Sequence, residues 1–209
     1  MIIISHRGYW KEPSQKNSIL SFKNSFNLGC GTETDVRDHA GELVISHDPP
    51  LGNEIKLSEF LNLLKGTNYP LALNIKSDGL AKKINDVMTL SQHSNWFVFD
   101  MTIPDMQSHL THNNPVYTRL SDIETQPYNI DRAIGIWLDA FYSDGWQLAQ
   151  IDFWLKKNKK VCVVSPELHG RDHYPFWSKL LLSSSLHHSN LALCTDHPEK
   201  AQKFFGSKS

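Results

Sequence analysis

Two acidic residues separated by a single residue, Glu33 and Asp35, are the strongest chemical signal in the sequence. They lie in a short apolar, β-prone run, 32–36, and side chains two positions apart on a strand point to the same side. Two like charges held together in a protein interior are unfavourable unless a cation or a proton compensates them. Oxygen ligands of this kind suit Mg²⁺ or Ca²⁺. An alternative stays open, in which one of the two faces a helix and forms an ordinary salt bridge.

Residues able to bind phosphate and to transfer protons follow other β-prone runs. His6 and Arg7 follow the first run, His47 ends a hairpin-like segment, and Asn74 and Lys76 end the third run on one face. A divalent ion, one arginine and one lysine would neutralise the oxygens of a phosphate, while two histidines can give and take protons near neutral pH. Together these side chains predict a site that cleaves a phosphodiester.

Short apolar runs that alternate with stretches of helical spacing must position these residues. The eight runs cover 1–5, 32–36, 70–75, 96–99, 115–117, 134–138, 161–164 and 191–194. The helical stretches cover 17–28, 58–64, 80–90, 103–110, 146–157, 175–182 and 198–205, with Asn17 as the expected cap of the first, and 121–132 is expected to form a short helix or a loop. This alternation predicts a single (β/α)8 TIM-type barrel over 1–209, whose reactive groups lie at the carboxyl ends of the strands. An open doubly wound sheet is the alternative, but no GxGxxG or GxxxxGK[ST] motif follows a strand.

Charge and composition limit the partners. The chain has 209 residues, with 21 Lys and Arg against 22 Asp and Glu, so no overall positive field favours nucleic acid. No run approaches the roughly 18 apolar residues of a membrane span, so we expect no integral membrane segment. Three widely spaced cysteines and the absence of a signal-peptide pattern favour a cytoplasmic protein. The oligomeric state stays open.

The order of the motifs resembles a known family. His-Arg-Gly stands at 6–8, Asn-Ser at 17–18, Glu-x-Asp at 33–35, His-Asp at 47–48, a strand-three lysine at 76 and Thr-Asp-x-Pro at 195–198. This pattern, which spans nearly the whole chain, resembles the glycerophosphodiester phosphodiesterases and their phosphatidylinositol-specific phospholipase C-like relatives. The resemblance implies a TIM-type barrel that uses Mg²⁺ or Ca²⁺ to hydrolyse a phosphodiester next to a free hydroxyl, through a cyclic phosphate.

The resemblance also implies roles for individual residues. His6 and His47 would be the general acid and general base, in an order that the sequence leaves open. Arg7 and Lys76 would bind the phosphate, and the metal would be held by Glu33, Asp35 and Asn74.

Three departures from the family pattern indicate a divergent branch. Asn74 stands where the family usually has a third acidic ligand, so metal affinity should be lower. Lys16 replaces the acidic residue that usually precedes Asn17. The segment 49–69 is too short for the usual cap insertion, so we expect a compact barrel with a more open mouth.

Residues after the late strands are candidates for contacting the rest of the substrate, a small-molecule or glycan phosphodiester. They are Arg119, Asp139, Glu167 and His169, and Trp10 beside the first motif is a further candidate for the pocket mouth. Glu167 and His169 would bind sugar hydroxyls or supply a replacement metal ligand. Two other functions stay open: a catalytically silent barrel that binds a phosphorylated sugar or lipid headgroup, and a lyase that stops at the cyclic phosphate.

Overall fold

The computed structural model describes residues 1–206, and within them nine strands form one sheet. The strands are β1 (Ile2–Ser5), β2 (Gly31–His39), β3 (Glu42–Ile45), β4 (Leu71–Ile75), β5 (Trp96–Phe99), β6 (Tyr117–Ser121), β7 (Gly135–Asp139), β8 (Lys160–Val164) and β9 (Leu191–Thr195). Eight of them are parallel neighbours in the order β5-β4-β2-β1-β9-β8-β7-β6, and β3 pairs antiparallel with the outer end of β2.

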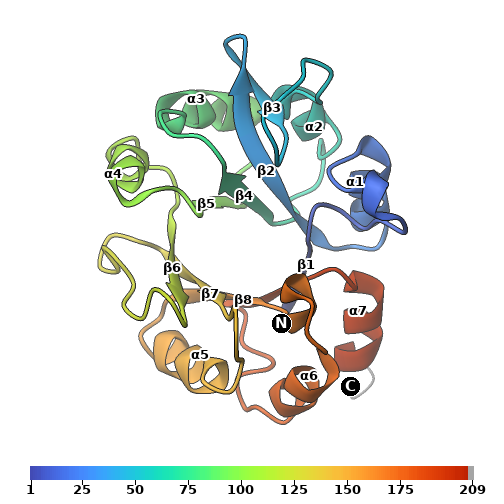
Figure 1. The fold of residues 1–209 in the computed structure, drawn as a ribbon, viewed down its shortest axis with the longest axis vertical. Coiled ribbons are helices and arrows are strands. Elements are labelled where there is room, and N and C mark those ends of the chain that lie inside the picture. Colours follow the sequence, from blue (N-terminus) through green and yellow to red (C-terminus); the bar gives the residue numbers. More distant parts are fainter. Residues whose placement is uncertain (207–209) are drawn as a thin grey trace.

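The eight parallel strands close into a nearly complete barrel (Figure 1). β5 and β6 meet through a single parallel bridge between Val98 and Val116, in which the Val98 N–H donates to the Pro115 carbonyl at 2.9 Å. Helices follow most of the strands on the outside of the ring, although none lies between β6 and β7 (Figure 1). The expected (β/α)8 barrel is therefore confirmed, and the open doubly wound alternative is wrong.

Seven α-helices and two 3-10 helices surround the described barrel. They are η1 (Pro13–Gln15), α1 (Ile19–Asn27), α2 (Leu57–Asn62), α3 (Ala81–Ser91), α4 (Ile103–Thr111), α5 (Gln147–Lys156), η2 (Pro166–His169), α6 (Tyr174–Leu181) and α7 (Pro198–Gly206). Among these described helices, none is both long enough and apolar enough to cross a lipid bilayer.

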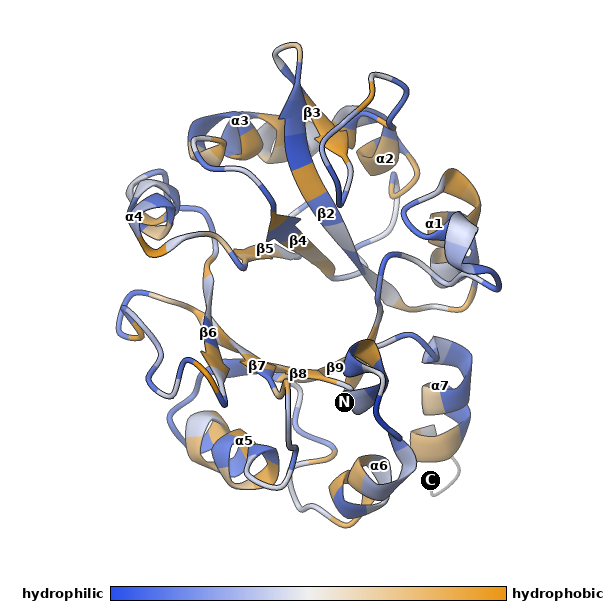
Figure 2. Cartoon of the chain, in the orientation of Figure 1, coloured by the Kyte–Doolittle hydropathy of each residue, from blue (hydrophilic) through white to orange (hydrophobic). Residues whose placement is uncertain are grey.

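Hydrophobic side chains form three clusters that match the layers of the barrel. One cluster packs α1 to α4 against β2, β4 and β5, and a second packs α5 to α7 against β7, β8 and β9. The third fills the barrel interior and includes Ile4, Phe97, Phe99, Trp137 and Cys162. β2 differs from the other strands, because much of its length is hydrophilic (Figure 2). The barrel thus carries polar groups on one strand of an otherwise apolar wall.

Several element boundaries differ from those predicted by the sequence pattern. Helix α1 begins at Ile19, and its cap is Ser18, whose hydroxyl accepts the Ser21 N–H, so Asn17 is not the cap. The predicted strand at 115–117 instead runs from Tyr117 to Ser121, since only from residue 117 onward does the chain pair in register with β7. The described residues 122–134 form turns without a helix.

The segment between β3 and β4 holds only loops and helix α2. Leu57, Phe60 and Leu61 of this helix are buried in the outer core, so the helix belongs to the barrel's own helical layer. This chain therefore has no cap domain over the site at this position, as its short length predicts.

Candidate active site

Glu33 and Asp35 both point into the barrel. In the parallel register with β4, Glu33 lies opposite Ala72 and Asp35 opposite Asn74, and Ala72 belongs to the interior cluster. The two acidic residues are 1% and 0% exposed. A salt bridge from either of them to an outer helix is therefore wrong, and the barrel interior contains two neighbouring buried acids.

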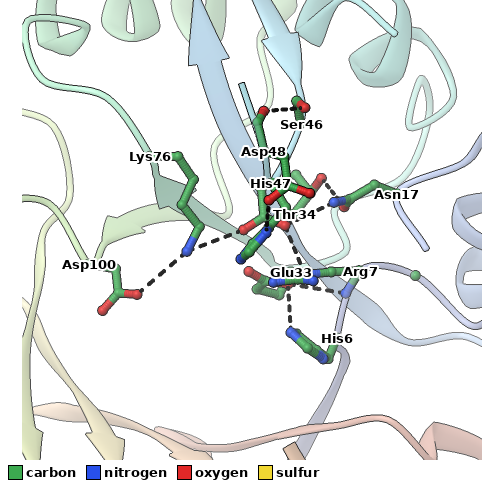
Figure 3. A network of polar contacts seen from close by, with 12 residues as sticks. His6, Arg7, Asn17, Glu33, Thr34, Ser46, His47, Asp48, Lys76 and Asp100 are labelled. Carbon is green, nitrogen blue, oxygen red and sulfur yellow. Dashed lines mark hydrogen bonds and ion pairs between the residues drawn. The ribbon is translucent and has the colours of Figure 1, made fainter. Parts of the chain in front are cut away.

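Two basic side chains and an amide surround Asp35 (Figure 3). Arg7 Nε lies 2.8 Å from Asp35 Oδ2 and Lys76 Nζ lies 3.5 Å from Asp35 Oδ1, both as ion pairs. Asn17 donates from Nδ2 to Asp35 Oδ2 at 2.9 Å and accepts from the Thr34 hydroxyl at the same distance. The buried charge of Asp35 is thus compensated by groups from three different loops and strands.

Fewer polar and basic groups contact the Glu33 carboxylate than the Asp35 carboxylate. It accepts the Arg7 backbone N–H at 3.1 Å, and His6 Nε2 lies 3.9 Å from its Oε2. Burial and the charge of Asp35 raise the pKa of Glu33 to about 7, although the charges of His6, Arg7 and Lys76 oppose this rise. In the metal-free protein, Glu33 therefore holds a proton over much of the range below neutral pH.

The oxygen atoms beside this acid pair suit a hard divalent cation. Asp35 Oδ1 and Asn74 Oδ1 are buried and accept no hydrogen bond, and their residues are register partners on adjacent strands. Carboxylate and amide oxygens are preferred ligands of Mg²⁺ and Ca²⁺. Within residues 1–206 no three His, Cys, Asp or Glu side chains form a metal-binding cluster. The candidate ligand set therefore consists of two carboxylates and one amide, and it would need water or substrate oxygens to complete it.

His6 is oriented from two sides. Its Nδ1 lies 2.7 Å from Asp196 Oδ1, and its backbone carbonyl accepts the indole N–H of Trp10 at 3.1 Å. The side chain is 15% exposed, and the bond to Asp196 leaves Nε2 directed toward Glu33. Asp196 was not predicted as a site residue, although the Thr-Asp-x-Pro motif is the sequence signal that could have identified it.

His47 lies at the same end of the barrel in a more open setting. It follows β3, and the Ser46 N–H donates to the Asp35 carbonyl at 3.1 Å, which fixes this loop to the end of β2. His47 Nδ1 lies 2.9 Å from Asp48 Oδ1, and the two side chains are 47% and 87% exposed. Figure 3 draws His47 over the same end of β2 as Glu33, but within the described residues no hydrogen bond or ring contact joins it to His6.

A third histidine–carboxylate pair lies across the barrel mouth. His169 Nε2 is 2.6 Å from Asp139 Oδ1, and the His169 ring packs on Phe141 with 4.8 Å between ring centroids. Asp139 is the last residue of β7, which is four places from β2 in the strand order. In an eight-stranded ring this position is opposite the acid pair, so a bound molecule could touch both sides.

The remaining candidates have partners within the protein. Arg119, inside β6 and not after it, pairs with Asp100 and with Glu124. Trp10 lies under the ammonium group of Lys16, which is 4.5 Å from its ring centroid. Glu167 accepts hydrogen bonds from the hydroxyls of Ser165 and Thr195 and from the Asp196 backbone N–H.

Comparison with solved structures identifies proteins of the same fold. A glycerophosphodiester phosphodiesterase from Agrobacterium tumefaciens matches over 99% of this chain and 98% of its own, with a TM-score of 0.72 and 16% identity. A glycerophosphoryl diester phosphodiesterase from Parabacteroides distasonis matches over 99% of this chain and 86% of its own, with a TM-score of 0.71 and 14% identity. A dihydropteroate synthase from Xanthomonas albilineans matches over 99% of this chain and 91% of its own, with a TM-score of 0.51 and 12% identity. No family model matches the sequence, and a search of curated proteins found no match.

These likenesses confirm the fold expected from the motif resemblance. All three proteins match over almost the whole chain, and the protein named as a synthase has the lower TM-score. Because one fold serves unrelated reactions, the function must be argued from the residues of the site.

Proposed function

We propose that this chain is a metal-dependent phosphodiesterase that hydrolyses a glycerophosphodiester-like substrate through a cyclic phosphate. One observation carries the proposal: a buried acid pair, flanked by Arg7 and Lys76, lies within 3.9 Å of an oriented histidine at the carboxyl ends of barrel strands. The motif order and the fold likeness to two phosphodiesterases support the same reaction class.

Glu33, Asp35 and Asn74 would hold Mg²⁺ or Ca²⁺. The buried Oδ1 atoms of Asp35 and Asn74 accept no hydrogen bond, although Lys76 Nζ lies 3.5 Å from the Asp35 atom, and this supports the assignment. When bound, the cation would polarise the phosphoryl oxygens and stabilise the charge that develops on them.

The protein's own residues would bind the phosphate and move protons. Arg7 and Lys76 already lie beside a carboxylate oxygen, so the same side chains can reach the phosphate oxygens of a substrate bound there. One of His6 and His47 would take the proton of the hydroxyl adjacent to the phosphodiester, whose oxygen then bonds to phosphorus. The other would protonate the departing alcohol as its bond to phosphorus breaks. Water would then bond to phosphorus and open the ring, giving a monoester.

Asp139 and His169 would face the alcohol part of the substrate from across the mouth. His169 Nε2 is occupied by Asp139 Oδ1, which leaves Nδ1 and the second carboxylate oxygen free to meet substrate hydroxyls. Phe141 would line this part of the mouth, and Trp10, whose indole N–H donates to the His6 carbonyl, would line the side of the acid pair. Sugar or polyol hydroxyls combined with an apolar face are the chemistry that such a surface accepts.

A panel of phosphodiesters, incubated with Mg²⁺, Ca²⁺, Mn²⁺ or EDTA and followed by phosphorus NMR, tests the proposal. We expect a monoester product that EDTA abolishes and added metal restores. A cyclic product that persists would indicate a lyase instead. Turnover that is unaffected by EDTA would refute the metal requirement.

A catalytically silent binding barrel is the second candidate. The observation in its favour is that Arg7 and Lys76 already occupy both oxygens of Asp35. This candidate predicts that calorimetry detects binding of a phosphorylated sugar or lipid headgroup in EDTA, while phosphorus NMR detects no product from any member of the panel.

A further inference from the structure

Glu167 has a role that its sequence position does not indicate. Its place after a late strand predicts contact with substrate or metal, but both of its carboxylate oxygens bind groups of the barrel wall. Oε2 accepts the Ser165 hydroxyl at 2.5 Å, and Oε1 accepts both the Thr195 hydroxyl and the Asp196 backbone N–H, the latter at 3.1 Å. Both hydroxyl donors belong to residues that are 0% exposed.

We propose that Glu167 is a positioning residue, which fixes Asp196 so that Asp196 can orient His6. This inference rests on the proposed function, because it assigns Glu167 to the histidine that would transfer a proton there. Glu167 makes no contact with Glu33, Asp35 or Asn74 among the described interactions.

The chain of contacts is continuous. Asp196 Oδ1 lies 2.7 Å from His6 Nδ1, and the His6 backbone N–H donates to the Thr195 carbonyl at 3.0 Å. Glu167 binds both residues of this Thr195–Asp196 pair, one through its side chain and the other through its backbone. Since the partner of one imidazole nitrogen decides which nitrogen carries the proton, fixing Asp196 keeps the proton of neutral His6 on Nδ1 and leaves Nε2 as the reactive atom.

The same segment also carries the histidine of the third histidine–carboxylate pair. Glu167 and His169 belong to η2, which follows β8, so the bonds of Glu167 join this segment to the end of β9. Two carboxylates at the mouth are therefore both bonded to η2: Glu167 accepts the backbone N–H of Asp196, and His169 contacts Asp139. This arrangement explains why an acidic residue stands at a place where its carboxylate binds the barrel wall and not the acid pair.

The variants Glu167→Gln and Glu167→Ala separate positioning from direct contact. Glutamine keeps an oxygen for Thr195 and Asp196 and can donate to the Ser165 oxygen, whereas alanine removes all three bonds. We expect Glu167→Ala to lower kcat about 10-fold to 100-fold, the usual scale for an outer partner that orients a ligand or base, with KM changed less than about threefold. Glu167→Gln should keep most of the activity. Loss of activity in both variants to the same degree, with a large rise in KM, would overturn the proposal.

Nitrogen NMR on ¹⁵N-labelled, substrate-free protein in EDTA gives a readout that does not depend on activity. The signals of His6 are assigned by their absence in His6→Asn. We expect the proton of neutral His6 to lie on Nδ1 in the wild type and in Glu167→Gln. In Glu167→Ala we expect a mixture of two neutral forms, one with the proton on Nδ1 and the other with the proton on Nε2. An unchanged proton position in Glu167→Ala would refute the positioning role even if the protein proves to have no phosphodiesterase activity.

Two further variants complete the design. Thr195→Val removes the Thr195 bond to Glu167 together with the acceptor of the His197 backbone N–H, and it serves if Glu167→Ala does not fold. A partial shift of the His6 proton supports the proposal, and no shift refutes it. Glu59→Ala, at an exposed position of α2, is the matched control and should change neither kcat nor the His6 signals.

Discussion

Burial of Glu33 makes the stability of the metal-free protein depend on pH, and Glu33→Gln should remove that dependence. Burial beside Asp35 raises the pKa of Glu33 from its ordinary value of 4.5 to about 7. Below pH 4.5 the folded and the unfolded chain both hold this proton. Between pH 4.5 and 7 only the folded chain holds it, so the free energy of unfolding falls as pH rises; above pH 7 the contribution is constant.

The magnitude follows from the difference between the two pKa values. A rise from 4.5 to about 7, at 1.36 kcal/mol for each pH unit, corresponds to about 3 kcal/mol lost from the free energy of unfolding. Glutamine is neutral at every pH and keeps an oxygen that can accept the Arg7 backbone N–H. The stability of Glu33→Gln relative to wild type should therefore increase by about 3 kcal/mol between pH 4.5 and pH 8.

Urea unfolding of both proteins in EDTA, followed by tryptophan fluorescence at several pH values, measures this difference directly. The exposed Glu59 on α2 supplies the control, because Glu59→Gln should give a difference that does not vary with pH. A stability difference between Glu33→Gln and wild type that stays constant from pH 4.5 to 8 would show that Glu33 is not desolvated in the folded protein, and the reasoning would fail. Saturating Mg²⁺ or Ca²⁺ should stabilise the wild type increasingly as pH rises, and should leave Glu33→Gln nearly unaffected.

The remaining predictions concern individual positions. His6→Ala and His47→Ala should each lower turnover at least ~100-fold in the phosphodiester panel, while His187→Ala, at an exposed position outside the barrel mouth, should not change it. Asn74→Asp adds a third carboxylate, so calorimetric titration should give a Kd for Mg²⁺ or Ca²⁺ at least about tenfold lower than the wild type; an unchanged Kd would remove Asn74 from the ligand set. Gly8→Ala should lower the free energy of unfolding by about 3 kcal/mol in urea titrations, because Gly8 has φ +86° and a Cβ there would lie 2.4 Å from Ser21 Oγ.

Hydrophobic patterning predicted the barrel well because most of its strands are short apolar runs that alternate with helices. It also predicted the inward direction of Glu33 and Asp35, since a strand's period fixes which side chains share a face. The strand that contains Arg119 was placed too early, because Pro115 and Val116 are β-prone but only residues from Tyr117 onward pair with β7.

Contacts between distant segments could not be predicted from the sequence. His6 and Asp196 are 190 positions apart, and only closure of the barrel between β9 and β1 brings them to 2.7 Å. Glu167 illustrates the same limit, because a glutamate after a barrel strand has the same local sequence whether it faces a ligand or the wall. Which of these occurs depends on the hydroxyls that neighbouring strands place beside it.

Charge at the acid pair gives a physical reason for a metal requirement. With Glu33 protonated, the single negative charge of Asp35 and the two positive charges of Arg7 and Lys76 leave one positive charge, which matches a phosphodiester in its ground state. Asp100 also lies 3.9 Å from Lys76, but its charge is balanced by its ion pair with Arg119. Attack on phosphorus adds a second negative charge to the phosphoryl oxygens, and only interactions that strengthen in the transition state accelerate the reaction. If Glu33 and Asp35 held a divalent cation in place of the Glu33 proton, the net charge of these groups would be two, which would match the transition state better than the substrate. On this argument the metal-free protein should still bind phosphodiesters while turning them over slowly, and calorimetry in EDTA beside turnover with and without metal would separate the two effects.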